Sequence, residues 1–277
     1  MDKWKGYYLL SATFFGTILS QAMKLLCRVP RPWVRDPGFT VVKSAQAGAT
    51  GYSFPSGHTQ GAACAFGGIA RMSKRRWLRW SMVALIVLVG FSRMYLGAHY
   101  PSDVGAGLLV GLAAVLCLYP VFQRVKDSAR GMYAFLGAML LLSLGYLAFV
   151  RFAQFPADAY ETDAKTQTSN YANALKNAWS LLGALLGMLA AYTADRKTQF
   201  SEQAPLPGQI CKTVLGLALL VGIRAGLKYL FGMISDALYW NALRYFCMVF
   251  FAAAIWPLSF PFWAKLGKSS IGTRQFQ

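Results

Sequence analysis

The sequence predicts an all-α fold, namely a polytopic, integral-membrane bundle of about eight transmembrane helices. Of its 277 residues, 56% are apolar and only 14% are charged. With a mean hydropathy of +0.39, the chain is more apolar than an ordinary soluble domain of this length. The apolar residues also gather into stretches close to the roughly 20 residues that a helix needs to cross a bilayer.

The apolar stretches follow one another along the chain. They cover residues 7–26, 58–72, 77–96, 103–122, 131–150, 177–194, 210–231 and 240–258. The first is expected to be a retained helix, since Lys24 and Arg28 follow it without the small-residue site of a cleavable signal peptide. The second is short and rich in glycine and alanine, which suits a helix packed inside the bundle rather than one that faces lipid.

Three short motifs contain the residue types that phosphoryl transfer needs. In chain order they are Lys24-x6-Arg31-Pro32, Pro55-Ser56-Gly57-His58 and Ser92-Arg93-x5-His99-x3-Asp103. The chain has only 2 histidines, and both belong to these motifs. The motifs end the first predicted helix, open the second, and join the third to the fourth. They are therefore expected to meet at one membrane face.

These residue types predict a phosphate site without a metal. Ser56 is expected to cap a helix whose free N–H groups and dipole favour a bound phosphate, and Gly57 lets the backbone approach the ligand. Lys24, Arg31 and Arg93 add positive charge, and guanidinium groups grip phosphoryl oxygens through paired hydrogen bonds. The five cysteines show no C-x-x-C pairing, so neither a zinc site nor a disulfide framework is indicated.

Taken together, the three motifs resemble the signature of the type 2 phosphatidic acid phosphatase (PAP2) superfamily over about residues 20–120. The resemblance implies that His99 attacks phosphorus to form a phosphohistidine. It also implies that His58 protonates the leaving alkoxide and later helps to activate water. Asp103 is expected to hydrogen-bond the far ring nitrogen of His99, and if residues 99–103 are helical, the i, i+4 spacing puts both on one face. No cofactor is implied.

The resemblance also suggests how the chain is divided. Residues 1–130 are expected to form a PAP2-like catalytic core of four helices, and residues 131–277 to add further transmembrane helices to the same membrane domain. Familiar members place two spans before the first motif, whereas this chain offers one and adds about four after the third. Either the late helices replace the missing packing or the chain is an N-terminally shortened form.

The basic residues predict the orientation, because short cytoplasmic loops hold the excess of Lys and Arg. One alternate set of loops holds Lys3, Lys5, Arg71, Lys74, Arg75, Arg76, Arg79, Arg124, Lys126, Arg130, Arg196, Lys197, Lys212, Lys265, Lys268 and Arg274. It predicts cytoplasmic N and C termini in a bacterial-type plasma membrane or an equivalent membrane. The three motifs then lie on the extracytoplasmic side, with the segment 151–176, whose acidic Asp158, Glu161 and Asp163 leave it without a basic excess. That segment is either an active-site lid or a plain linker.

Four further cations are candidate headgroup contacts. Arg28 and Arg35 lie in the first outer loop, where basic residues break the charge rule, and this favours an anionic ligand. Plain contact with lipid headgroups is the alternative. Arg224 and Lys228 lie four apart in the seventh apolar stretch, where charge is costly. They either extend a headgroup pocket, pair with Asp236 or reach the interface.

The sequence thus predicts a membrane phosphatase that hydrolyses a lipid phosphate or diphosphate, of the phosphatidic acid, isoprenoid diphosphate, phosphatidylglycerophosphate or sphingoid phosphate type. A phosphotransferase or a sugar-phosphate phosphatase with the same site is an alternative, and a lipid-phosphate transporter or scramblase is an alternative of another class. The net charge of +18 does not indicate nucleic acid, because the basic residues are dispersed among loops. The expected partners are the lipid phosphate and the bilayer, and the sequence does not indicate an oligomeric state.

Overall fold

The computed structural model describes residues 3–155, 164–196 and 204–265, and within these ranges it contains helices and no strands. Its long helices are α1 (Lys3–Cys27), α4 (Gly57–Met72), α5 (Arg76–Tyr95), α6 (Pro101–Val125), α7 (Ala129–Phe152), α8 (Ala164–Asp195), α9 (Leu206–Ile234) and α10 (Trp240–Phe250). The chain continues from α10 through a π-helical turn (Phe251–Ile255) and a 3-10 turn (Trp256–Ser259) into α11 (Phe260–Trp263). The first seven predicted apolar stretches each fall on one of these helices to within a residue, and the last, 240–258, covers α10 and the two turns that follow it.

The expectation of about eight spans is confirmed approximately. In the described part of the chain, 7 helical segments are long and apolar enough to cross a membrane. The remaining predicted span is α4, which has only 16 residues. Its length and small side chains make it an internal helix of the bundle, as the sequence suggested.

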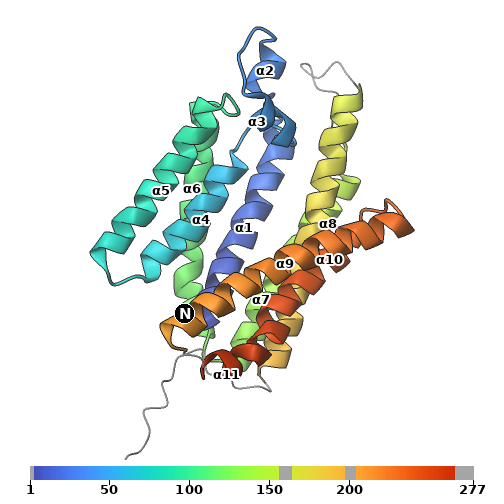
Figure 1. The fold of residues 1–277 in the computed structure, drawn as a ribbon. Coiled ribbons are helices and arrows are strands. Elements are labelled where there is room, and N and C mark those ends of the chain that lie inside the picture. The colour runs from blue at the N-terminus through green and yellow to red at the C-terminus, as the bar shows by residue number, and fades with distance from the viewer. Residues whose placement is uncertain (1–2, 156–163, 197–203, 266–277) are drawn as a thin grey trace, which may run out of the picture.

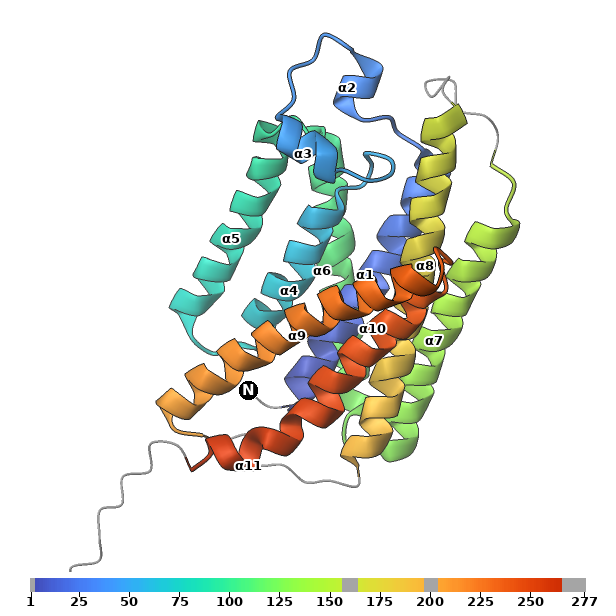
Figure 2. The same cartoon turned by 45° about the vertical axis from the view of Figure 1, so that its right-hand side comes forward.

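The helices form two groups that meet along α1. Figure 1 shows α1, α4, α5 and α6 gathered on one side, with α7 and α8 on the other. In both views, α9 and α10 run diagonally across the front of the bundle (Figure 2). Helix α8 links the groups, because it packs against α1, α7 and α10.

Helix α4 lies at the centre of the first group, in contact with α1, α5 and α6. The close approach of α6 to α4 depends on two glycines of α6. A Cβ on Gly111 of α6 would lie 2.5 Å from the Ala63 Cβ and 2.7 Å from the Gln60 carbonyl oxygen, both on α4. A Cβ on Gly107 would lie 2.5 Å from the Ser56 carbonyl oxygen. The two glycines therefore set the distance between α4 and α6.

Two short helices, α2 (Pro32–Arg35) and α3 (Lys43–Gly48), lie in the segment between α1 and α4. They were not predicted. Both cover the end of the bundle where α1 ends and α4 and α6 begin, opposite the N-terminus (Figures 1 and 2). Helix α1 itself ends at Arg28, whose left-handed backbone (φ 45°) lets its N–H donate to the Lys24 carbonyl oxygen at 3.0 Å.

Some sequence-based expectations concern residues outside the described ranges. The interpretation of the segment 151–176 as a lid or a linker concerns three such residues, Asp158, Glu161 and Asp163. The predicted orientation concerns three more, Lys197, Lys268 and Arg274. These expectations remain predictions.

The substitution Gly111→Ala tests the α4–α6 contact. We expect it to destabilise the protein by about 1–3 kcal/mol, because backbone and side-chain atoms of α4 must move to admit one methyl group. Gly105→Ala on the same helix is the matched control, since a Cβ there meets nothing within 4 Å. The measurement is the apparent unfolding midpoint of detergent-solubilised protein at one fixed heating rate. Equal midpoints for the two variants would contradict the packing described here.

Candidate active site

A cavity of about 450 Å³ opens at the covered end of the bundle, and it brings together residues of all three motifs. Those that line it are Lys24, Arg31, Gly57, His58, Arg93 and His99. The predicted meeting of the motifs at one end of the bundle is therefore confirmed. The other lining residues come from α1, α4, α8, the segment before α4 and the turn before His99, and are Thr17, Gln21, Ser44, Ala45, Gly48, Ala49, Thr50, Gln60, Gly61, Ala98 and Asn177.

His99 is buried (5% exposed) and lies in the turn between α5 and α6. The turn is built on Gly97, whose φ of +70° favours glycine and where an added Cβ would lie 3.0 Å from the Thr40 carbonyl oxygen. Helix α6 starts only at Pro101, so the condition that residues 99–103 are helical is not met. Proline at the first helical position fixes the start of the helix and leaves His99 outside it.

His99 and Asp103 nevertheless meet, because Asp103 stands in the first turn of α6 and reaches back. The His99 Nδ1 lies 3.3 Å from the Asp103 Oδ2, as predicted. The same carboxylate oxygen accepts from the Tyr100 backbone N–H at 2.9 Å and from the Ser53 hydroxyl. Asp103 is fully buried, so these donors stabilise its charge and fix its position.

Arg31 determines which nitrogen of His99 carries the proton. Its Nη1 lies 2.9 Å from the His99 Nε2, and because a guanidinium only donates, Nε2 must be the acceptor. The proton of the neutral ring is then on Nδ1, which faces Asp103. This tautomer leaves the Nε2 lone pair on the cavity side, the arrangement that nucleophilic attack requires.

The environment of His99 keeps its imidazole neutral. Burial, followed by the charges of Arg31 and Lys24, lowers the pKa of His99 from 6.5 to about 4, although its hydrogen bond to Asp103 acts in the opposite direction. The ring is therefore unprotonated at neutral pH. A neutral imidazole has the lone pair that an attack on phosphorus needs.

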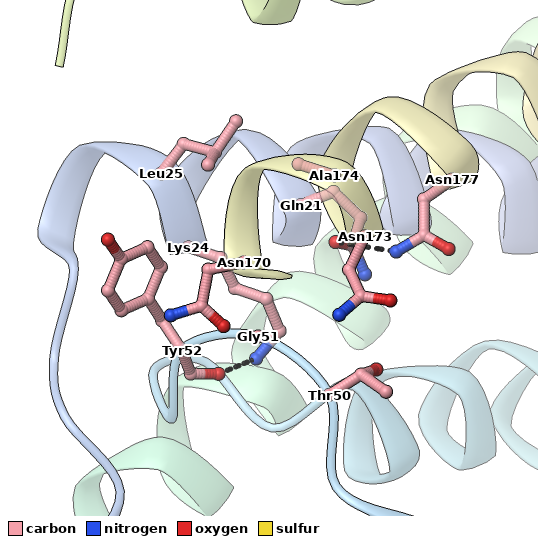
Figure 3. Close-up of a pocket in the computed structure, with 10 residues that line it drawn as sticks. All are labelled: Gln21, Lys24, Leu25, Thr50, Gly51, Tyr52, Asn170, Asn173, Ala174 and Asn177. Atoms are coloured by element: carbon pink, nitrogen blue, oxygen red, sulfur yellow. Dashed lines mark hydrogen bonds between the residues drawn. The ribbon is translucent and has the colours of Figure 1, made fainter. Parts of the chain in front are cut away.

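The two cations of the first motif bind the backbone of the segment before α4. Lys24 is buried, and its Nζ donates to the carbonyl oxygens of Tyr52 and, at 3.4 Å, Ser53; Figure 3 shows the first of these bonds. Arg31 donates to backbone carbonyl oxygens at Gly51 (3.1 Å), Thr50 (3.1 Å) and Ala98 (2.9 Å). Both cations are thus held beside the cavity by neutral carbonyl oxygens. Because these oxygens carry no full negative charge, they do not neutralise the cations.

The second motif starts α4 as predicted. Ser56 is the N-cap, and its Oγ accepts from the Thr59 N–H at 3.4 Å. Its own N–H donates to the Asp103 carbonyl oxygen at 2.9 Å, which ties the second motif to the third. Ser56 is buried beneath the cavity rather than lining it, whereas Gly57 lines it and His58 projects an exposed ring into it.

The cations proposed as headgroup contacts do not line this cavity. Arg28 and Arg35 lie beside it, at the end of α1 and in α2. Arg224 and Lys228 are exposed on α9, which contributes no residue to the cavity. Within the described ranges, neither forms an ion pair with Asp236. Their role as headgroup contacts therefore remains a prediction.

Sequence reasoning missed several polar residues of the site. Ser53 lies between the His99 and Asp103 side chains, with its Oγ 3.4 Å from the His99 Nδ1. Gln21 and Asn177 face the cavity from α1 and α8. The only signal for Asn177 was a carboxamide inside an apolar stretch, which is costly and therefore calls for an explanation.

Comparison with known families adds the decisive observation. Residues 5–127 match the PAP2 superfamily, and residues 179–268 match the transmembrane extension of PAP2 superfamily phosphatases. Together, these matches cover more than half of the chain. The chain belongs to the PAP2 superfamily. It is an integral membrane protein, since the matched extension is transmembrane and the described helices include candidate spans.

Individual PAP2 relatives match over part of their length. The undecaprenyl-diphosphatase BcrC of Bacillus subtilis is 35% identical over 115 residues, which is 42% of this chain and 54% of the relative. The lipid A 1-phosphatase of Rhizobium etli is 34% identical over 109 residues (39% and 46%), and the phosphatidylglycerophosphatase B of Bacillus subtilis is 32% identical over 134 residues (44% and 61%). The chain thus spans about half the length of the curated relatives that it matches. No solved structure gives a significant match.

The titration of His99 can be followed by NMR, because the chain has only 2 histidines. In detergent-solubilised protein with isotope-labelled histidine, His99 is expected to stay neutral as the pH falls below 6.5 and to titrate near pH 4. The protonated ring is disfavoured because it would be buried beside Arg31 and Lys24. His99→Ala assigns the signal by removing it, and a His99 signal that titrates near 6.5 would show that the site does not have the described burial.

Proposed function

We propose that this PAP2 protein is a membrane phosphatase that hydrolyses a lipid phosphate or lipid diphosphate through a phosphohistidine on His99, without a metal. The observation that carries the proposal is the arrangement of His99 itself. Its Nδ1 faces the buried carboxylate of Asp103 at 3.3 Å, while its Nε2 faces the cavity beside the Arg31 guanidinium at 2.9 Å. The Nε2 lone pair is thus directed to the place where positive charge can hold a phosphoryl group.

In the proposed first step, the His99 Nε2 forms a bond to phosphorus, and the bond from phosphorus to the ester oxygen breaks. Arg31 at present donates to that lone pair, so a phosphoryl oxygen that takes over its N–H also releases the nucleophile. His58 gives its proton to the leaving oxygen. The imidazolium that forms at His99 is stabilised by Asp103, much as a carboxylate stabilises the histidine of a serine protease.

In the second step, His58 accepts a proton from water, whose oxygen attacks phosphorus as the bond to the His99 Nε2 breaks. Phosphate leaves, and both histidines return to their starting states. Lys24, Arg31 and Arg93 line the cavity and neutralise the charge that develops on the phosphoryl oxygens in both steps. The helix start at Gly57 adds backbone N–H groups on the same side.

The substrate class follows from the membrane location and from the relatives. Their names specify an undecaprenyl diphosphate, the 1-phosphate of lipid A and phosphatidylglycerophosphate. All are phosphates attached to lipids, and we propose the same broad class for this chain. The cavity lies at one end of the membrane helices, where such a headgroup would meet it.

Phosphate release in the presence of EDTA tests the proposed chemistry. The panel is phosphatidic acid, an isoprenoid diphosphate, phosphatidylglycerophosphate, a sphingoid phosphate and a sugar phosphate. We expect the detergent-purified protein to release phosphate from at least one lipid, and His99→Ala to lower the rate by at least about a thousandfold, because the nucleophile is lost. Acid-labile, protein-bound phosphate should form in the wild type and not in His99→Ala.

His58→Ala is the matched comparison, because it should still form the phosphohistidine from an aryl phosphate, whose leaving group needs no proton. Release that requires an added alcohol acceptor would instead indicate a phosphotransferase. Lipid-phosphate transport that survives His99→Ala without any phosphate release would replace the proposal with a transporter or scramblase.

We further propose that the cavity is extracytoplasmic and that the chain lies in a bacterial-type plasma membrane. Helices α4 and α5 are antiparallel, so the basic run between them, from Arg71 to Arg79, lies at the end of the bundle opposite the cavity. Short loops with such an excess of positive charge are retained in the cytoplasm.

A protease-site insertion tests this orientation. A cleavable tag placed after Gly38, in the exposed segment between α2 and α3, should be cut in intact spheroplasts. The same tag placed after Lys74, between α4 and α5, should be cut only after lysis, because the basic loop is held inside. The reverse pattern would place the cavity on the cytoplasmic side.

A further inference from the structure

Two chemically different sets of residues line the cavity. The cations and histidines of the motifs form one set. The other set is neutral and polar, with the side chains of Thr17, Gln21, Thr50, Gln60 and Asn177. A volume of about 450 Å³ falls within the roughly 300–1,000 Å³ of small-molecule pockets. The cavity therefore has room for more of a headgroup than its phosphoryl group.

The neutral set includes a residue of α8, a helix from the second half of the chain. Asn170, Asn173 and Asn177 recur along α8 at helical spacing and face the end of α1, where Figure 3 shows them beside Gln21. Of the three, Asn177 also lines the large cavity. It lies outside both ranges that match PAP2 families, residues 5–127 and 179–268.

Gln21 and Asn177 make one hydrogen bond to each other, and each side chain can form further hydrogen bonds. The Asn177 Nδ2 donates to the Gln21 Oε1 at 3.2 Å (Figure 3). Within the described residues, the Gln21 amide nitrogen and the Asn177 carboxamide oxygen have no other partner, and both residues are half-buried against the cavity. The pair thus presents a donor and an acceptor side by side, and a buried carboxamide is stabilised when such groups are satisfied.

We propose that Gln21 and Asn177 form a headgroup subsite that binds a hydroxyl group of the alcohol to which the phosphate is attached. A hydroxyl both donates and accepts, and so matches a carboxamide nitrogen and a carboxamide oxygen together. A prenyl chain offers neither group, and a second phosphate offers only acceptors. The substrate class is therefore a lipid whose phosphate sits on a glycerol or sugar with a free hydroxyl. This inference rests on the proposed function, because the cationic residues of the motifs must hold the phosphoryl group.

A structural role for the amides makes a different prediction. Carboxamides often join transmembrane helices through hydrogen bonds, and the Gln21–Asn177 bond does join α1 to α8. If that were its whole role, a substitution would lower stability and affect every substrate alike. A substitution that affects one substrate more than another would therefore indicate a role in substrate binding, whereas an equal effect on all substrates would indicate a structural role.

The first test compares kcat/KM for phosphatidylglycerophosphate and phosphatidic acid with identical acyl chains. Only the former has a free hydroxyl on the glycerol that carries the reacting phosphate. We expect the wild type to prefer it, and Asn177→Leu to lower its kcat/KM by about tenfold, the scale of one hydrogen bond, while phosphatidic acid changes little. Asn173→Leu is the matched control, because Asn173 lies on the same helix but does not line the large cavity. Equal loss on both lipids would overturn the subsite.

The second test measures binding without turnover, using His99→Ala protein and two soluble three-carbon phosphate esters. Glycerol 1-phosphate should bind about tenfold more tightly than propyl phosphate, and Asn177→Leu or, if that variant does not fold, Gln21→Met should abolish the difference. Equal affinity in the parent protein would overturn the subsite even if phosphate release is normal. A binding preference for glycerol 1-phosphate, found together with a wild type that releases no phosphate from any substrate of the panel, would overturn the proposed function and leave the subsite supported.

Discussion

The buried carboxylate of Asp103 is the constraint on which the rest of the site depends. A fully buried charge is costly unless several donors surround it. Asp103 obtains them from the Tyr100 N–H and the His99 ring in the turn before α6, and from Ser53 in the segment before α4, so two separate parts of the chain must converge on it. That convergence fixes the ring of His99, and the fixed ring in turn positions its Nε2 beside Arg31. One carboxylate therefore orders His99, the proposed nucleophile, and the segment that covers it.

Sequence patterns predicted the helices and the residues around the phosphate, because both depend on local signals. The length of the apolar stretches predicted the positions of the long helices, and the motifs predicted the cations and histidines that line the cavity. The condition that residues 99–103 are helical is not met, because α6 starts at Pro101, and Asp103 reaches His99 from the first turn of that helix instead. Ser53 and Asn177 could not be predicted, because their positions depend on how the segment before α4 folds and on which helix packs beside α1. Those are tertiary contacts without a local pattern.

The second half of the chain does more than pack against the first. Helix α8 contacts α1, α7 and α10, and it extends its asparagines to the end where the motifs meet. The boundary expected near residue 130 stays a prediction, but the cavity includes a side chain from beyond it. The two proposals together give a division of labour, in which the motifs supply the reaction and α8 contributes to the choice of headgroup.

The shortness of α4 has a consequence for the depth of the cavity. Its 16 residues make a helix about 24 Å long, whereas the hydrocarbon core of a bilayer is about 30 Å thick. Because α1, α5 and α6 surround α4, the protein and not the lipid takes up this difference. The start of α4, where His58 lines the cavity, can then lie below the membrane interface. A lipid phosphate would reach His58 only by entering the bundle, so the depth of the cavity would limit which headgroups have access.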